Sequence, residues 1–388
     1  MRLIHTADWH LGRSLKGKDR TVEIEFALDE MVRQAKELDV DAVLVAGDIF
    51  ETFNPPVEAE RVAYEFFCKL QAAKIPAVAI AGNHDSSTRI DSLASLLSFV
   101  GVHALGKPRT GEDGGVITLD TPGGKLCVGA MPFANERRML DPDELWNLDN
   151  LQQLQSYRDT VDWLLSDLTS SFRDDSVNVL MSHITIDGAK LANSEKDFHS
   201  KGIYALPRQS LPPEAQYIAL GHIHKRQSIE GYPHAFYSGS LIQVDFGEAG
   251  EDKGFNLITL EPGMPASVDF IPIACQKSLK VVECELSDLE EKLELHRHHP
   301  GYLKVIVNLQ TPQVGLADKV RKICPQTIHI EPRYPEANSS KEESFNGDNL
   351  DPLVEFQRYY QQQLGDTPTR AVVMKFEELY KEMHDATT

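Results

Sequence analysis

Five short motifs contain residue types that bind metal ions, and each motif falls at the end of an expected strand. The motifs are Asp8-Trp9-His10, Gly47-Asp48, Gly82-Asn83-His84-Asp85, Ser182-His183 and Gly221-His222-Ile223-His224. Side chains two positions apart in an extended chain project from the same face, so Asp8 and His10 can reach a common ion. The same holds for His222 and His224.

Setting Asp85 aside, the motifs supply two carboxylates, one carboxamide and up to five imidazoles. Mixed oxygen and imidazole ligands suit manganese, iron or zinc better than calcium or magnesium. Seven or eight ligands are too many for one tetrahedral ion. They suit two ions about 3.5–4 Å apart that share a carboxylate. Asp48 is the expected bridge, because its strand lies between the other ligand loops. Each motif alone is more often a turn or a hydrogen-bonded histidine, but together they favour a metal site.

The elements that must position these motifs alternate between strand and helix over the first hundred residues. Strands are expected at 2–6, 41–46 and 75–81, and helices at 22–38 and 57–73. Further strand patterns cover 116–119, 126–130, 177–181, 217–220, 235–237, 255–260 and 268–273, with a long helical pattern at 143–168. Two strand-rich halves with amphipathic helices predict an α/β fold, a two-sheet β-sandwich flanked by helices, over residues 1–273.

Beyond this domain the pattern changes twice. Residues 274–335 alternate short strands and helices and predict a small α+β capping domain. Residues 336–350 are polar and predict a linker. Residues 351–388 contain two helical patterns, 353–364 and 369–383, which predict a helical hairpin. Its apolar residues are too many for an isolated hairpin to cover, so the hairpin needs a surface to bury against.

The overall charge is acidic. The 388 residues include 39 Lys and Arg against 59 Asp and Glu, a formal charge of −20. This balance argues against coating nucleic acid by bulk charge, although bound cations reverse the field of an acidic pocket. One basic stretch, residues 190–226, has a net charge of +3. Its candidate phosphate contacts are Lys190, Lys201, Lys225 and Arg226, with a solvated loop as the equal alternative.

The cysteines and apolar segments indicate the compartment. The five cysteines are scattered and form no CxxC pair, which argues against a disulfide framework or a thiolate zinc site. The apolar runs are far shorter than the 18 or so residues of a membrane span. A secretory signal is not expected, because His5, Asp8 and His10 occupy the positions where such a signal has an apolar core. We therefore expect a reduced, cytoplasmic protein without a membrane partner.

The series of motifs resembles the calcineurin-like metallophosphoesterases. The opening Leu3–Gly12 further resembles the SbcD family, the nuclease subunits of bacterial SbcCD double-strand-break repair complexes. The segments Val45–Phe50, Ala81–Ser86, Ala219–His224 and Tyr237–Ser240 extend this resemblance. It covers residues 1–260 by motif and the remainder by the order of domains.

The resemblance implies a particular assignment of the site. One divalent ion would be held by Asp8, His10, Asp48 and His224, and a second by Asp48, Asn83, His183 and His222. The ions would be Mn²⁺, with Mg²⁺ as the alternative. His84 would act as acid or transition-state stabiliser. Archaeal and eukaryotic relatives have a histidine at the position of Glu51, which here either orients a ligand or faces solvent.

The resemblance also implies an activity and partners. The chain would be a DNA exonuclease and endonuclease, acting also on hairpin or blocked ends, in repair, recombination and replication. An SbcC-type coiled-coil ATPase would bind the C-terminal helices, and the capping domain would bind DNA. A homodimer within a heterotetramer would form through residues 59–67 or 93–100. Two alternatives remain open: a phosphodiesterase acting on nucleotides or small phosphodiesters, and a non-catalytic scaffold linking an ATPase to DNA.

The chain itself offers no site for hydrolysing ATP. Gly12-x4-Gly17-Lys18 resembles a phosphate-binding loop, but Asp19 follows where a hydroxyl should bind the metal. Any dependence on ATP would therefore come from another protein in the complex.

Overall fold

The computed structural model describes residues 1–134, 150–192 and 205–334, together with several positions between 353 and 376. Residues Met1–Tyr334 form one compact unit and Pro335–Thr388 a second. The expected boundary at residue 274 falls inside the first unit, so the separation of a 1–273 domain from a 274–335 domain stays a prediction. The predicted linker 336–350 lies outside the described residues.

Two sheets form the core of the first unit. The first sheet has the order β14 (Ser267–Pro272), β13 (Gly254–Thr259), β1 (Arg2–Thr6), β4 (Ala42–Val45), β5 (Ala77–Ile80) and β6 (Val102–Leu105). The second has the order β11 (Gln227–Ile229), β12 (Tyr232–Tyr237), β10 (Tyr217–Gly221), β9 (Val177–His183), β8 (Gly124–Met131) and β7 (Val116–Thr121). Strands β1, β4, β5 and β6 run parallel in the first sheet, and β8, β9, β10 and β12 run parallel in the second.

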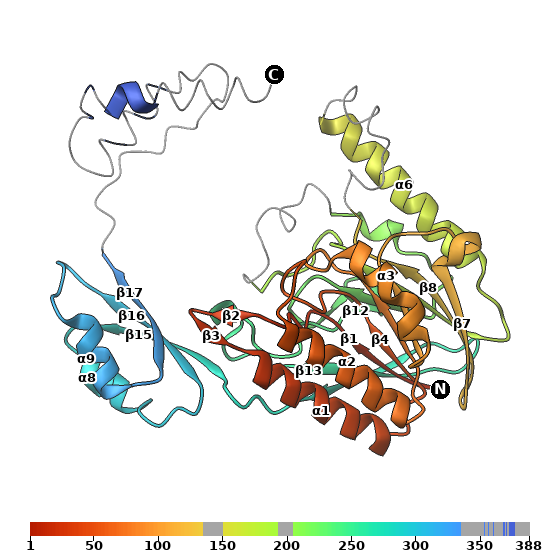
Figure 1. Cartoon of the computed structure of the whole chain (residues 1–388), viewed down its shortest axis with the longest axis horizontal. Coiled ribbons are helices and arrows are strands. Elements are labelled where there is room, and N and C mark those ends of the chain that lie inside the picture. Colours follow the sequence, from red (N-terminus) through yellow and green to blue (C-terminus); the bar gives the residue numbers. More distant parts are fainter. Residues whose placement is uncertain are drawn as a thin grey trace. The chain divides into compact units, whose positions relative to one another are not determined.

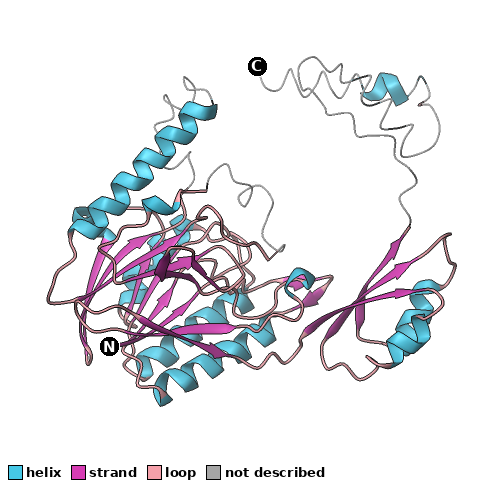
Figure 2. Cartoon of the chain, turned by 180° about the vertical axis from the view of Figure 1, so that it is seen from behind, coloured by secondary structure: helices cyan, strands magenta, loops and turns pink. Residues whose placement is uncertain are grey.

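Helices cover the outer faces of both sheets. Helices α1 (Thr21–Glu37), α2 (Val57–Ala72) and α3 (Ser87–Ser98) pack on the first sheet, and α6 (Asn150–Ser170) packs on the second (Figures 1 and 2). Alternation along β4 sets these layers, because Val43 and Val45 face the helices whereas Leu44 faces the other sheet. The predicted helix-flanked sandwich is confirmed.

Helix α2 shows why the apolar spacing predicts its position. Ala59, Phe66 and Phe67 lie on its buried stripe, and the ring of Trp9 meets that of Phe66 edge-on, with ring centroids 5.1 Å apart. The sequence pattern did not predict helix α3 or the short strand β6. The hydroxyl of Ser86 caps α3 by accepting from the backbone N–H of Arg89.

A small sheet follows the sandwich. It contains β15 (Leu279–Glu285), β16 (Tyr302–Asn308) and β17 (Thr327–Arg333), connected by α8 (Leu289–Glu294) and α9 (Leu316–Ile323). The three strands run parallel, because each connection is a crossover helix. Both helices cover the face that carries Val282, Val305 and Val307. The opposite face meets the sandwich through Leu15 and Phe246, beside the hairpin of β2 (Ser14–Leu15) and β3 (Lys18–Asp19).

The second unit is described at few positions. Helical residues occur at Leu353, Phe356 and Tyr360 and again at 372–376, within the two predicted helical patterns. The rings of Phe356 and Phe376 stack with centroids 4.1 Å apart, so the two patterns contact each other as in a hairpin. No helix in the described part of the chain is long and apolar enough to cross a membrane.

Candidate metal centre

The predicted ligands meet at one edge of the sandwich, where parallel strands of both sheets end. Asp8 and His10 follow β1, Asp48 follows β4, Asn83 and His84 follow β5, His183 ends β9, and His222 and His224 follow β10. Their ligand atoms fall into groups that could each hold an ion, including Asp8 with His10 and His224, and Asp48 with His183 and His222. Distances reported below place Asn83 in the second group. The structure thus brings together every ligand that the sequence predicts.

The backbone is strained at these positions. Among the described residues, seven non-glycine positions have positive φ, and four of them are Asp8, His10, Asp48 and His222. The left-handed region is sparsely populated by such residues and persists only where surrounding structure enforces it. The strain therefore gathers where the chain must turn sharply to direct side chains inward.

Two motif glycines leave room for the ligands. A Cβ on Gly82 would lie 2.1 Å from Oδ1 of Asp48, and a Cβ on Gly47 would lie 2.3 Å from Nδ1 of His183. Gly47 also has a φ of +94°, which disfavours any other residue. The glycines that precede Asp48 and Asn83 are therefore needed for the close approach of neighbouring loops.

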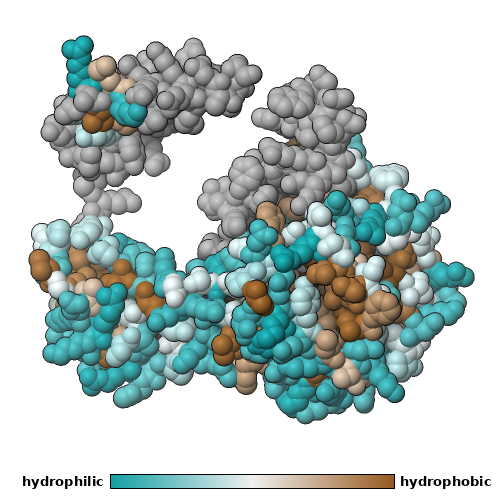
Figure 3. Space-filling view, in the orientation of Figure 1, coloured by the Kyte–Doolittle hydropathy of each residue, from teal (hydrophilic) through white to brown (hydrophobic). Residues whose placement is uncertain are grey.

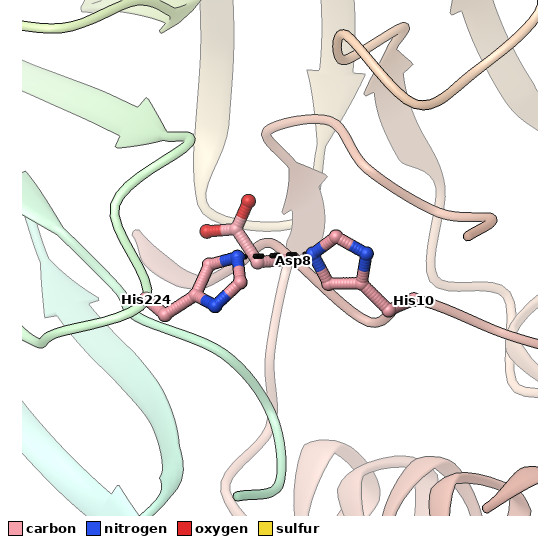
Figure 4. Close-up of side chains that lie close together, drawn as sticks. All are labelled: Asp8, His10 and His224. Atoms are coloured by element: carbon pink, nitrogen blue, oxygen red, sulfur yellow. Dashed lines mark hydrogen bonds between the residues drawn. The ribbon is translucent and has the colours of Figure 1, made fainter. Parts of the chain in front are cut away.

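The first group is arranged around two facing imidazoles. The Nε2 atoms of His10 and His224 lie only 3.0 Å apart, with Asp8 beside them (Figure 4). Nδ1 of His10 lies 2.8 Å from Oε2 of Glu51, and Nδ1 of His224 lies 3.0 Å from Oε1 of Glu248. Carboxylates only accept, so each Nδ1 carries the hydrogen and each Nε2 presents a lone pair. Two such lone pairs repel unless a cation lies between them, so this group fits a metal ion.

The second group brings two imidazoles together with a carboxylate and a carboxamide. Nδ1 of His183 donates to the carbonyl oxygen of Ala46 at 2.7 Å, which directs Nε2 toward the other predicted ligands. That Nε2 lies 3.0 Å from Oδ1 of Asn83 and 3.4 Å from Oδ2 of Asp48. Nδ1 of His222 lies 2.8 Å from the same Asn83 oxygen. Burial opposes the charge of His183, but Asp48 raises its pKa to about 9, so without an ion a protonated ring can donate to Asn83. Two imidazoles, a carboxylate and a carboxamide oxygen nevertheless meet at one point, which is a donor set that fits a divalent ion.

Asp48 lies between the two groups. Its Oδ2 is 3.8 Å from Nε2 of His10 and 3.4 Å from Nε2 of His183. Its Oδ1 accepts from the backbone N–H of His84 at 2.8 Å. Burial disfavours the charged carboxylate, but the imidazoles of His183 and His10 hold the pKa of Asp48 well below its usual range. Asp48 is therefore an anion at the position expected of a bridge.

His84 lies beside these groups. Its Nδ1 donates to the carbonyl oxygen of Glu51 at 2.8 Å, and its ring centroid lies 4.8 Å from that of His10. His84, His10 and Asp48 are also close enough to hold an ion together. Proximity alone therefore does not separate a ligand from an acid, and the assignment of His84 as a non-ligand stays a prediction.

Glu51 is only partly exposed and faces His10, a predicted ligand. Its carboxylate contacts His10 and also forms a 2.8 Å ion pair with Nη1 of Arg13. Burial opposes its charge, but His10 and Arg13 hold the pKa of Glu51 at about 2. Of the two alternatives that the sequence left open for Glu51, the contact with His10 favours the first, that it orients a ligand.

Two buried acids support the site but were not predicted to do so. The carboxylate of Asp85 accepts from the backbone N–H groups of Ile49, Phe50 and Gly82 at 2.8–3.2 Å, which joins the loops after β4 and β5. Glu248, which holds His224, stands 24 residues further along the chain. The adjacency of Asp85 to Asn83 and His84 was a signal for it, whereas no spacing pattern indicated Glu248.

The predicted phosphate contacts lie in different surroundings. Lys190 is exposed, whereas Nζ of Lys225 lies 3.3 Å from Oε1 of Glu251. Arg226 donates to Oδ1 of Asn256 and lies over the ring of Phe270, so it already packs against the sandwich. Lys201 lies outside the described residues. Contact of these residues with DNA stays a prediction.

Comparison with known proteins agrees with the site. The calcineurin-like phosphoesterase family profile matches residues 1–226, and the profile SbcD_C, described as type 5 capsule protein repressor C-terminal domain, matches residues 275–363. The SbcD protein of the SbcCD nuclease from Bacillus subtilis (strain 168) is 33% identical over 389 residues, covering 98% of this chain and 97% of that protein. The chain belongs to the SbcD family of calcineurin-like phosphoesterases.

Other members of the SbcD family are similar as well. The SbcD protein of the SbcCD nuclease from Escherichia coli (strain K12) is 32% identical over 308 residues, covering 76% of this chain and 74% of that protein. A solved dimetal phosphatase from Danio rerio is 14% identical, with a TM-score of 0.41, covering 70% of this chain and 98% of that one. A TM-score this low is no argument for a shared fold, so the family rests on the sequence matches.

Replacing Asp85 should destabilise the site loops. Asp85→Ala leaves the N–H groups of Ile49, Phe50 and Gly82 without this acceptor, and each buried unpaired donor costs about 1–3 kcal/mol. We expect a loss of about 3 kcal/mol or more in the free energy of unfolding, measured by urea denaturation with a chelator present. Asp85→Asn keeps an acceptor oxygen and should lose less. Asp162→Ala, on the exposed face of α6, is the control and should stay within about 0.5 kcal/mol.

The same residue gives a dependence on pH. Burial and the charge of Asp48 raise the pKa of Asp85 to about 7, whereas an unfolded Asp titrates near about 3.9. Between these values the folded chain binds a proton that the unfolded chain has released, so the contribution of Asp85 to stability falls as pH rises from about 4 to 7. Asp85→Asn should flatten this fall. Equal free energies of unfolding for Asp85→Ala, Asp85→Asn and the control Asp162→Ala would contradict the role given to Asp85.

Proposed function

We propose that this chain is the metal-dependent nuclease component of a complex with an SbcC-type ATPase and that it hydrolyses DNA phosphodiester bonds. It would act as exonuclease and endonuclease, including on hairpin or blocked ends, in repair, recombination and replication. The relatives over most of its length carry the name of this nuclease. The observation that carries the proposal is the pair of electron-rich groups on either side of Asp48.

We assign the ligands in two sets. The first ion is held by Asp8, His10, Asp48 and His224, and the second by Asp48, Asn83, His183 and His222, in agreement with the two groups that converge on Asp48. Mn²⁺ is the proposed ion, with Mg²⁺ able to replace it, because imidazole and oxygen ligands in equal share suit manganese better.

The chain's own residues would contribute to hydrolysis by holding the ions and by moving a proton. Divalent ions in such a pair activate a water molecule and neutralise the charge on the phosphate oxygens. Asp48, held as an anion, keeps the two ligand sets together. His84 retains its Nδ1 proton against the carbonyl oxygen of Glu51, so Nε2 is the atom that exchanges a proton with the leaving oxygen. No nucleophilic serine or cysteine is required.

The remainder of the chain supplies partners. We propose that residues 336–350 link the nuclease to a hairpin at 351–388 that binds the coiled coil of the ATPase. The stacked rings of Phe356 and Phe376 support this hairpin. Residues 274–335 would cap the site and contact DNA, together with Lys190, Lys201, Lys225 and Arg226. The acidic charge of −20 makes local contacts and bound cations, rather than bulk attraction, the means of holding DNA.

A cleavage assay with Mn²⁺ tests the function. The chain with its ATPase partner should cut hairpin and linear duplex DNA, and Asp48→Ala should abolish cleavage because both ligand sets lose their shared carboxylate. His84→Ala should reduce turnover by about 10²–10⁴-fold. It should nevertheless retain both ions, counted by elemental analysis.

The outcomes separate the alternatives. Cleavage of a chromogenic small diester without cleavage of DNA would favour a small-molecule phosphodiesterase. If Asp48→Ala leaves the function of the complex intact, the chain is a non-catalytic scaffold. Loss of one ion in His84→Ala would make His84 a ligand. Asp162→Ala, far from the ligand loops in sequence, is the matched control and should cleave normally.

We propose that the homodimer forms through α3 rather than the buried stripe of α2. In the 59–67 segment, Ala59, Phe66 and Phe67 already pack on the core. In the 93–100 segment, Leu96 is 64% and Phe99 82% exposed. Figure 3 shows hydrophobic side chains gathered in the region where α3 lies in Figure 1. An apolar face of this kind is typical of an interface.

A charged substitution at α3 tests this interface. Phe99→Glu should place an unpaired charge in the contact and weaken dimerisation by at least about tenfold, measured by sedimentation equilibrium of the nuclease chain. Phe53→Glu, at the neighbouring exposed aromatic, extends the test. Val22→Glu on exposed α1 is the control. A dimer that withstands Phe99→Glu would place the interface elsewhere.

A further inference from the structure

We infer that Glu248 is a positioning residue for His224, and that docking of the small sheet (β15–β17) controls this contact through residues 243–253, the relay segment. The inference rests on the metal-dependent nuclease proposed above and adds a means of regulating one of its two ions.

Glu248 holds the ring of His224 from behind. Its side chain is fully buried, and Oε1 lies 3.0 Å from Nδ1 of His224. Oε2 accepts from the hydroxyl of Ser240 at 2.8 Å and from the backbone N–H of Val244 at 3.2 Å. A carboxylate behind a metal-binding histidine fixes the tautomer and the direction of the ring. Glu248 therefore determines where Nε2 of His224 points.

Lys253 reinforces this contact. Its Nζ lies 2.9 Å from Oε2 of Glu248 and donates to the backbone carbonyl of His224 at 2.9 Å. The ammonium neutralises a carboxylate that would otherwise be costly to bury. His224 is thus held through both its ring and its backbone, and both contacts come from the relay segment.

The same segment is joined to the small sheet. Phe246 packs in one cluster with Leu15 and Leu279, the first residue of β15. The side-chain oxygen of Gln243 accepts from the backbone N–H of Leu279 at 2.7 Å. Glu248 is therefore two residues from one contact with the small sheet and five residues from the other.

Arg20 secures the joint from the sandwich side. It is fully buried and donates to the backbone carbonyl of Gln243 at 3.0 Å. Its guanidinium also lies 5.6 Å from the centroid of the Tyr302 ring, at the start of β16. One buried side chain thus contacts both the relay segment and the small sheet, so a shift of either one alone would break a contact of Arg20.

The chain of contacts predicts a selective coupling. Displacing the small sheet would move Phe246 and Gln243 and release Glu248 from His224, which belongs to only one of the two ligand sets. The affinity for that ion would fall, whereas the ion between Asp48, Asn83 and the other histidines would be affected less. By thermodynamic linkage, binding of the first ion must in turn strengthen docking of the small sheet.

Binding of Mn²⁺ to the full chain, measured by titration calorimetry, tests the coupling. Phe246→Ala, which keeps every ligand, should weaken one of two Mn²⁺ sites by about fivefold or more and leave the other within about twofold. Glu248→Gln should weaken the same site by about 10–100-fold. Leu303→Ala truncates a residue buried in the small sheet's own helix-covered core and should change neither site.

Hydrogen exchange supplies the reciprocal measurement. Mn²⁺ should slow amide exchange in residues 243–253 and at the start of β15 in the unmodified chain, but not in His224→Ala. This measurement tests the coupling even if Phe246→Ala or Glu248→Gln folds poorly, because it compares the unmodified chain with and without Mn²⁺.

The results that overturn the inference are distinct from those that overturn the function. Unchanged affinities in Phe246→Ala, or equal weakening of both sites, would remove the coupling while DNA cleavage by the unmodified chain left the proposed function standing. Unchanged affinity in Glu248→Gln would remove its positioning role. An unmodified chain that binds no Mn²⁺ and cuts no DNA would overturn both.

Discussion

Repulsion between lone pairs at the edge of the sandwich is the constraint on which the rest of the site depends. The Nε2 atoms of His10 and His224 face each other at 3.0 Å, because their other nitrogens are committed to Glu51 and Glu248. Across Asp48, Nε2 of His183 and Nδ1 of His222 lie 3.0 and 2.8 Å from the Asn83 oxygen, which are hydrogen-bond distances. The contact between the two Nε2 lone pairs is favourable only around a cation, so Glu51 and Glu248 prepare His10 and His224 for binding metal.

The fold maintains this arrangement with rigid elements. Parallel strands of two packed sheets end side by side. The predicted ligands lie at or just after the strand ends, so little flexible loop separates them from the sheets. The left-handed backbone at Asp8, His10 and Asp48 is tolerated because the buried sheets over-determine it. Asp85 then joins two of the loops by accepting their backbone N–H groups. The stability of the sheets thereby offsets the cost of holding charged and polar groups in place.

The sequence predicted which residues converge because each motif directly follows, or ends, a recognisable apolar strand. Asp8 and His10 do fall in one group after β1, although their backbone is left-handed rather than extended. The expectation that His222 and His224 reach a common ion was wrong, because His224 joins Asp8 and His10 whereas His222 joins Asp48 and His183. Strand β6 was missed because its four residues give little periodicity, and α3 because only Ser87 and Ile90 of its residues are buried. The supporting acids are a different case: Glu248 acts through a tertiary contact that only the folded chain creates.

The account stands on two ions meeting at Asp48. The most direct measurement is an anomalous difference map from crystals of the full chain grown with Mn²⁺. We expect two peaks about 3.5–4 Å apart, both within bonding distance of the Asp48 carboxylate. A single peak, or peaks remote from Asp48, would contradict it.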